Sequence, residues 1–227
     1  MNLKIKDIAD LLQISEKTVY RWVREKKLPA YRINYQYRFN KDEINEWILK
    51  NKAPVSDGVI ASALNNKNVS LIDCINNGGI YYKIAGENVA DVLKNSINLI
   101  RTPGDIDKET ILSLLLKREE MMSTAIGSGI ALPHPRTPII SDISNESVSI
   151  CFLNSPVDFK ALDNLPVFAV IIVLSANQAR HLEILSKISY LCRQQNFIGL
   201  LKKEPLREEI LEYIRNEKKK WDKIIQN

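Results

Sequence analysis

The sequence lacks any run of about 18 consecutive apolar residues, the length that a membrane-spanning helix needs. Its longest apolar stretch, Val167–Leu174, has the length of a buried strand. The segment MNLKIKDIAD contains no apolar core of the kind that a signal peptide carries. Only three cysteines occur, at Cys74, Cys151 and Cys192, and none forms a CxxC pair. An odd, scattered set indicates reduced core thiols, so we expect a cytoplasmic protein without membrane contact.

Several catalytic motifs are also missing. No G-x-S-x-G elbow of a serine hydrolase occurs. Gly127–Gly129 is too short for a phosphate-binding P-loop and is not followed by Gly-Lys. The chain has only two histidines, His134 and His181, and their spacing matches no short metal-binding motif. We therefore expect neither a bound metal nor a cofactor.

The charge is concentrated at the N-terminal end. Residues 1–52 hold 12 Lys or Arg and 7 Asp or Glu, a net charge of +5, whereas residues 53–227 hold 20 of each. A local basic excess is typical of a segment that binds a polyanion. A solvated basic face would give the same count, so charge alone leaves both interpretations open.

The first residues predict two short helices joined by a tight turn. Apolar spacing favours a helix over Lys6–Leu12, and Ser15 is a suitable N-cap for a second helix over Glu16–Lys26. The second helix has an apolar face of Val19, Trp22 and Val23 and an outer face of Lys17, Tyr20, Arg21 and Arg24. Such a pair is typical of a helix-turn-helix.

An aromatic segment follows Pro29. Residues 30–39 alternate Tyr with Arg, which predicts two short strands turning near residues 34–36, in the position of a wing. Asn40 is then a suitable cap for a third helix. In its Thr-Val-Tyr-Arg-Trp stretch, its Lys-Leu-Pro-Ala turn and its final Glu-Trp-Ile, the segment 3–49 resembles the excisionase/MerR-type winged helix-turn-helix.

This resemblance implies that residues 1–52 bind DNA. In that family the second helix enters the major groove, so base edges or nearby phosphates would be contacted by Lys17, Thr18 and Arg21. Phosphates, which give affinity rather than sequence choice, would be held by Arg24, Lys27, Arg32 and Arg38. Arg38 has a second interpretation, as a residue that braces the wing. Because one small helix-turn-helix binds weakly alone, the expected partners include a second copy of the chain in a homodimer.

The remaining chain predicts a linker and a second domain. Residues 53–68 contain Pro, Gly, Ser and several Asn, which favours a connector with one helical segment near 57–64. In residues 69–227 helices interleave with buried strands, which predicts an α/β domain. The expected helices are 69–76, a helix opening at Asn88, Asp107–Met122, His181–Arg193 and Pro205–Lys218. The expected strands are Ile80–Ala85, Ile126–Pro133, Val148–Leu153 and Val167–Leu174, the last central and covered on both faces.

Both histidines follow predicted strands. His134 lies between Pro133 and Pro135, so it is presented on a stiff loop. His181 opens a helix directly after the predicted central strand. A lone histidine is usually structural, but strand ends in open α/β sheets form the usual site crevice, which favours a functional role for the pair.

The segment from Arg118 to His134, with its Ser-Thr, Gly-x-Gly-Ile-Ala and Pro-His, resembles the active-site segment of enzyme IIA domains. These are the fructose/mannitol-type and nitrogen-regulatory domains of the sugar phosphotransferase system (PTS). The stretch His-Leu-Glu-Ile-Leu from His181 resembles their second histidine motif, and the likeness covers roughly residues 80–227. It implies a mixed sheet flanked by helices.

The resemblance also implies a chemistry. His134 would accept a phosphoryl group from the phosphocarrier protein HPr or its nitrogen-branch relative. Arg118 would neutralise the phosphoryl oxygens, and His181 would orient the group. Further phosphoryl contacts would come from the backbone around Thr124 and from Arg136, which with Pro135 departs from the small residue common in the family. The alternative for Arg118 is a surface residue on the helix.

Three functions remain open at this point. The first is a DNA-binding regulator controlled by phosphorylation of His134, which couples sugar or nitrogen status to transcription. The second is a phosphocarrier that hands the group to a separate sugar-specific enzyme IIB. The third is a protein-binding regulator that never carries phosphate. No IIB or IIC sequence accompanies the two motifs, so sugar transport is not implied.

Overall fold

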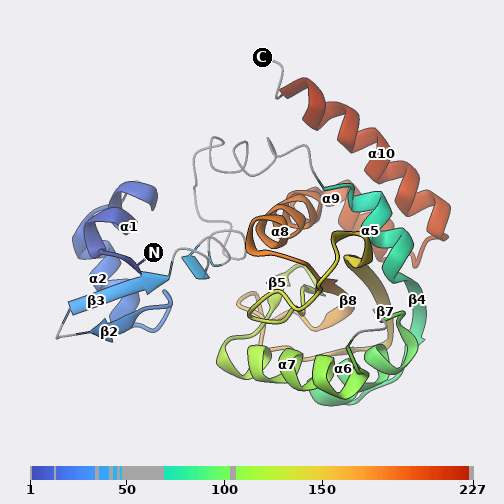
Figure 1. The fold of residues 1–227 in the computed structure, drawn as a ribbon, viewed down its shortest axis with the longest axis horizontal. Helices are drawn as coiled ribbons and strands as arrows, with labels where there is room; N and C mark the ends of the chain where they lie inside the picture. Colours follow the sequence, from blue (N-terminus) through green and yellow to red (C-terminus); the bar gives the residue numbers. More distant parts are fainter. Residues whose placement is uncertain are drawn as a thin grey trace. The chain divides into compact units, whose positions relative to one another are not determined.

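The computed structural model describes residues 2–12, 14–33, 36–40, 43–44, 47, 69–102 and 106–224. The chain divides into two compact units, Met1–Ala63 and Leu64–Asn227 (Figure 1). The predicted linker at residues 53–68, with its helical segment, lies outside the described residues, as does most of the predicted third helix after Asn40.

The N-terminal unit contains two helices and a small antiparallel sheet. The predicted helices are confirmed as α1, Ile5–Leu12, and α2, Glu16–Arg24. The two predicted wing strands are present and pair with each other, and a short strand that the sequence did not indicate joins them. The strands are β1, Asn2–Leu3; β2, Tyr31–Ile33; and β3, Gln36–Asn40; their order is β1-β3-β2.

Local sequence signals explain these elements. The Ser15 side chain accepts a hydrogen bond of 3.2 Å from the Thr18 N–H, so the predicted cap of α2 is confirmed. The apolar faces of the helices meet the sheet in one core, where Ile8, Val19 and Phe39 are fully buried. This unit is therefore a folded helix-turn-helix that leaves the outer face of α2 exposed to solvent.

The C-terminal unit is built on a five-stranded sheet, which is mixed and flanked by helices, as the family resemblance implied. The strand order is β4-β7-β8-β6-β5, with β4–β7 and β6–β8 parallel and the other two pairs antiparallel. The predicted central strand is confirmed as β8, Val167–Leu174, which is buried along nearly its whole length. The other strands are β4, Gly79–Ile84; β5, Ala125–Gly127; β6, Ile130–Ala131; and β7, Ser147–Val157.

One strand prediction was wrong. Instead of a single strand over Ile126–Pro133, β5 and β6 form a tight antiparallel hairpin. The reason is a run of three left-handed residues, Gly127 (φ 86°), Ser128 (φ 58°) and Gly129 (φ 80°), that reverses the chain. The Asp163 carboxylate accepts a hydrogen bond of 2.7 Å from the Ser128 N–H and so braces the turn.

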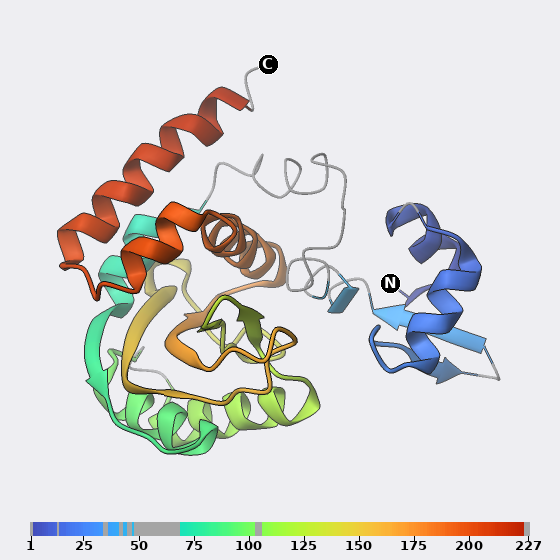
Figure 2. The same ribbon diagram turned by 180° about the vertical axis from the view of Figure 1, so that it is seen from behind.

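Helices cover both faces of the sheet. Figures 1 and 2 show α6 and α7 together on one side and α8 on the opposite side. The helices are α5, Leu71–Gly78; α6, Val89–Leu99; α7, Lys108–Met121; α8, Gln178–Cys192; α9, Gln195–Leu201; and α10, Arg207–Ile224. The predictions missed α9, and α8 begins three residues earlier than predicted. None of the helices in the described ranges has the length and apolar character needed to cross a bilayer.

Candidate functional site

His134 lies on the loop that leaves β6, and backbone hydrogen bonds hold this loop to its neighbours. The Leu132 N–H donates to the Thr124 carbonyl at 3.0 Å, and the Val173 N–H donates to the Pro133 carbonyl at 3.0 Å. The side chain of His134 is only 2% exposed. The imidazole therefore has a fixed position against the end of the central strand, as the flanking prolines predicted.

The hydrogen bond of His134 identifies its tautomer. Nδ1 of His134 lies 2.7 Å from the carbonyl oxygen of Leu132. A carbonyl oxygen only accepts, so the proton of a neutral His134 ring is on Nδ1. Nε2 then carries the free electron pair, and it is the nitrogen that can act as a nucleophile.

His181 lies next to His134. It is in the first turn of α8, which Asn177 caps by accepting from the Arg180 N–H at 3.0 Å. Its side chain is 4% exposed, and the two imidazole ring centres are 5.1 Å apart with an angle of 57° between the planes. The two histidines, 47 positions apart in the sequence, thus form one buried pair at the end of β8.

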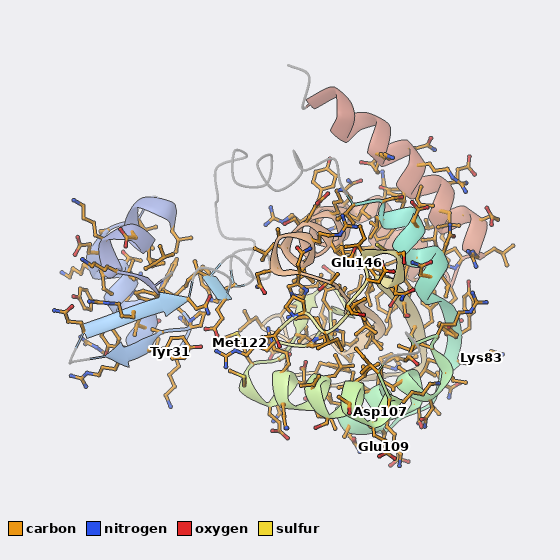
Figure 3. All side chains as sticks on the ribbon, viewed as in Figure 1. Tyr31, Lys83, Asp107, Glu109, Met122 and Glu146 are labelled. Carbon is orange, nitrogen blue, oxygen red and sulfur yellow. The ribbon has the colours of Figure 1, made fainter. Side chains whose placement is uncertain are left out.

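Arg118 lies in the last turn of α7 and is 7% exposed, so the interpretation as a surface residue is wrong. Its Nη1 donates to the Met122 carbonyl at 2.7 Å (Figure 3 labels Met122). This bond ties the guanidinium to the chain segment that leads into β5. Its expected role in neutralising a phosphoryl group stays a prediction.

Thr124 is held by a residue to which sequence reasoning gave no role. The Thr124 N–H donates to both carboxylate oxygens of Glu119, at 3.0 and 2.9 Å, and the Thr124 hydroxyl donates to Glu119 Oε2 at 2.6 Å. A contact across a helix end, five residues apart, leaves no periodic signal in the sequence. The Thr124 donors are therefore occupied by a carboxylate in this structure, and their expected contact with phosphate stays a prediction.

Arg136 and Arg180 both flank the histidine pair in sequence. Arg136 is exposed, two residues after His134, and its expected phosphoryl contact also stays a prediction. Arg180 forms an ion pair of 2.6 Å with the buried Glu146 (labelled in Figure 3), whose other oxygen accepts from the Ala176 N–H. The hydrogen bond that the Arg180 guanidinium donates to the Glu146 carboxylate raises the pKa of Arg180. This ion pair holds the start of α8, and the Arg180 guanidinium is bound to Glu146 in this structure.

The three cysteines offer no reactive thiol. All are buried and reduced, and burial raises the pKa of Cys74 and of Cys151 to about 12. A thiol with such a pKa is almost fully protonated near neutral pH and is a poor nucleophile. Within the residues that the structure describes, no group of three or more His, Cys, Asp or Glu side chains is arranged to hold a metal ion.

In the N-terminal unit, most of the predicted DNA-contacting side chains are exposed: Lys17, Arg21, Arg24, Lys27 and Arg32. Lys27 forms an ion pair of 2.8 Å with Glu25. Thr18 is half-buried, and its hydroxyl lies 3.0 Å from that of Ser15, within the helix cap.

Arg38 is also half-buried. It donates to the Tyr37 carbonyl at 3.1 Å and to Gln36 Oε1 at 2.7 Å. These contacts support its interpretation as a brace of the wing, while a phosphate contact stays a prediction.

Comparison with known families gives two matches in one chain. Residues 73–217 match the family described as phosphoenolpyruvate-dependent sugar phosphotransferase system, EIIA 2. Residues 3–52 match the family described as helix-turn-helix domain. The two matches fall in the two compact units of the structure.

Individual relatives agree with these matches. The chain is 32% identical over 134 residues to a nitrogen regulatory protein of Pseudomonas aeruginosa, which covers 58% of this chain and 85% of that relative. It is 30% identical over 101 residues to the transcriptional regulator ManR of Bacillus subtilis, covering 44% and 15% respectively. A structure described as a PTS IIA domain from Streptococcus pyogenes superimposes with a TM-score of 0.52 at 16% identity, covering 66% of this chain and 97% of that one. At this identity the likeness supports the fold alone.

Proposed function

Because the chain belongs to the PTS EIIA type 2 family and carries an N-terminal helix-turn-helix domain, we propose that it is a DNA-binding regulator controlled by phosphorylation of His134. The phosphoryl donor is a phosphohistidine carrier of the HPr type. The phosphorylation state couples sugar or nitrogen status to transcription. The observation that carries this proposal is the buried pair of His134 and His181, with Nε2 of His134 as the nucleophilic nitrogen.

The transfer follows from the tautomer of His134. Nε2 attacks the phosphorus of the donor phosphohistidine, and a new P–N bond forms as the donor P–N bond breaks. The electron pair of the broken bond stays on the donor imidazole nitrogen. The other nitrogen of the donor ring keeps its proton, so the donor leaves as a neutral imidazole and the positive charge passes to the His134 ring. The Leu132 carbonyl keeps Nδ1–H in place and stabilises the positive charge that develops on the His134 ring.

Positioning and electrostatics carry most of the catalysis in phosphoryl transfer. His181 is close enough to His134 to reach a group attached there. Arg118 and Arg136 are the nearest candidates in sequence for charge neutralisation, and Thr124 for hydrogen bonding. We assign these four residues to the phosphoryl site.

The N-terminal unit supplies the second half of the proposal. Its net charge of +5 and the exposed basic face of α2 favour a DNA partner. The relative ManR is named a transcriptional regulator, which supports the same role here. A homodimer is part of the proposal, since one such unit binds DNA weakly.

The phosphorylation half is tested by incubating the full chain with HPr, enzyme I and ³²P-labelled phosphoenolpyruvate. We expect one acid-labile label per chain, lost in His134→Gln and retained, at a lower rate, in His181→Gln. Tyr82→Phe, on the edge strand β4, is the matched control and keeps wild-type labelling. A wild-type chain that takes no label from HPr or its nitrogen-branch relative would contradict this half.

The DNA half is tested with duplexes selected from a random library by the full chain. We expect phosphorylation to change the affinity by roughly 5–150-fold, the usual range of coupling between two sites. The variant His134→Gln should not respond to the donor. Equal affinities for both states, together with transfer to a purified enzyme IIB, would favour the phosphocarrier function instead.

A further inference from the structure

Ser175 connects the two sides of the histidine site. It directly follows β8 and is 2% exposed. Its hydroxyl oxygen lies 2.9 Å from Nδ1 of His181. Its carbonyl oxygen accepts from the N–H groups of Ile139 and Ile140, each at 3.2 Å, on the loop that follows His134. One residue thus touches both the second histidine and the loop of the first.

The direction of the Ser175–His181 bond follows from burial. Within the described part of the chain, Nδ1 of His181 is the hydrogen-bond partner of the Ser175 hydroxyl. A buried hydroxyl proton without an acceptor is costly, so the hydroxyl donates to Nδ1. Nδ1 of His181 is then unprotonated, and the proton of the neutral ring is on Nε2.

We propose that Ser175 is a positioning residue that holds His181 with its proton on Nε2, ready to donate a hydrogen bond to a phosphoryl group on His134. This inference rests on the proposed phosphoryl transfer. The two rings then have complementary tautomers: His134 presents an unprotonated Nε2 to the phosphorus, and His181 presents an Nε2–H to the phosphoryl oxygens. The Ser175 hydroxyl acts only through His181.

The backbone around Ser175 makes this arrangement rigid. The Val173 N–H holds the Pro133 carbonyl on one side of His134, and the Ser175 carbonyl holds Ile139 and Ile140 on the other. Both sets of bonds come from the backbone, so they remain when the Ser175 side chain is changed. The substitution Ser175→Ala therefore removes the contact with His181 and leaves the His134 loop in place.

The matched control is Ser189→Ala. Ser189 is also a buried serine, it lies on α8 with His181, and its hydroxyl has no hydrogen-bond partner among the described residues. We expect Ser175→Ala to lower the rate of phosphoryl transfer from phosphorylated HPr about tenfold, as for loss of one hydrogen bond to a charged or polarised group. Ser175→Thr, which keeps a hydroxyl, should restore most of the rate, and Ser189→Ala should stay at the wild-type rate.

A double-mutant cycle separates positioning from general support of the fold. If Ser175 acts through His181, Ser175→Ala has no further effect in a His181→Ala background. If Ser175→Ala lowers the rate of phosphoryl transfer equally in the wild-type and the His181→Ala backgrounds, Ser175 supports the loop in general, and the proposal is overturned. A wild-type rate for a folded Ser175→Ala variant would overturn it as well.

A second measurement needs no phosphodonor. Nitrogen-15 NMR of the full chain reports the protonation of each imidazole nitrogen, and with two histidines in the sequence each signal is assigned by one His→Gln variant. We expect a proton on Nε2 of His181 and on Nδ1 of His134 near neutral pH. A proton on Nδ1 of His181, or a doubly protonated ring, would overturn the inference. If HPr labels no histidine but these tautomers are found, the proposed function fails and the positioning by Ser175 stands.

Discussion

The two units of this chain expose and bury their predicted functional side chains in opposite ways. In the N-terminal unit most of the basic side chains expected to contact DNA are exposed to solvent. In the C-terminal unit His134 and His181 are at least 96% buried, and each has a ring nitrogen held by a named partner. Attraction to a polyanion needs only charge at the surface, whereas transfer of a phosphoryl group needs one ring nitrogen in one place.

The same contrast is seen in two Lys–Glu ion pairs. Lys27 and Glu25 are 2.8 Å apart, with side chains 63% and 41% exposed. Lys187 and Glu183 are 2.5 Å apart on α8, with side chains 8% and 2% exposed. Val69 joins the second pair, since its N–H donates to Glu183 and its carbonyl accepts from Lys187. Four buried polar groups therefore depend on each other in the C-terminal unit.

The largest effect is expected when the buried pair is broken. Lys187→Met leaves the Glu183 carboxylate buried beside an apolar side chain, so we expect the free energy of unfolding of the C-terminal unit to fall by about 3–5 kcal/mol. Lys27→Met removes an exposed pair and should give no measurable change. Urea unfolding followed by tyrosine fluorescence and circular dichroism measures both. If both variants lost a similar free energy of unfolding, the buried and the exposed ion pair would not differ in their contribution to stability.

The next effect concerns the support of Thr124. In Glu119→Ala the Thr124 N–H and hydroxyl lose their acceptor, and Thr124 is only 3% exposed. An unsatisfied buried donor costs about 1–3 kcal/mol, so we expect a loss of stability in this range and faster amide exchange in β5. Glu120→Ala, at the neighbouring exposed position, is the control. Unchanged exchange in β5 would show that Glu119 does not hold this segment.

A smaller effect is expected in DNA binding. Arg24→Ala removes one exposed charge from the end of α2, and if Arg24 contacts a phosphate the affinity should fall severalfold for every sequence tested. The slope of log K against log salt concentration should become less negative by about 1. Lys203→Ala removes another exposed charge, from the C-terminal unit, and should change neither quantity. An unchanged slope for Arg24→Ala would remove this residue from the interface.

The sequence was most informative where local rules decide the structure. Ser15 before an amphipathic stretch predicted the start of α2, and apolar residues at every position of Val167–Leu174 predicted a strand covered on both faces. Mixed parallel and antiparallel pairing followed from the family resemblance and not from these rules. The hairpin at Gly127–Gly129 was missed because three successive left-handed residues are set by tertiary contacts such as that with Asp163.

The site was predictable only in part for the same reason. His134 was identified because two prolines and a family motif surround it, and His181 because the chain has so few histidines. Glu119 and Ser175 were missed, since each acts through a contact that the fold creates and that no local pattern encodes. The distance between the two imidazole rings likewise depends on how β6, β8 and α8 meet.

The smallest effect concerns the caps of two helices, one in each unit. Ser15 caps α2 with a hydroxyl, and Asp107 (labelled in Figure 3) caps α7 with a carboxylate. The hydrogen bonds from the Thr110 hydroxyl and N–H hold the pKa of the Asp107 carboxyl below its ordinary value of 3.8. The carboxylate therefore contributes its full stabilisation of the folded chain above pH 3.8. This contribution is lost as the pH falls through the lowered pKa that Asp107 has in the folded chain.

We expect both Ser15→Ala and Asp107→Ala to lower the thermal midpoint slightly at pH 7. The difference between Asp107→Ala and the wild type should shrink as the pH falls below 3.8, while the effect of Ser15→Ala should not depend on pH, because a hydroxyl does not titrate in this range. Calorimetry of the three chains between pH 7 and pH 3 measures this. If Asp107→Ala lowers the thermal midpoint by the same amount at pH 7 and at pH 3, the carboxylate charge does not contribute to the cap of α7.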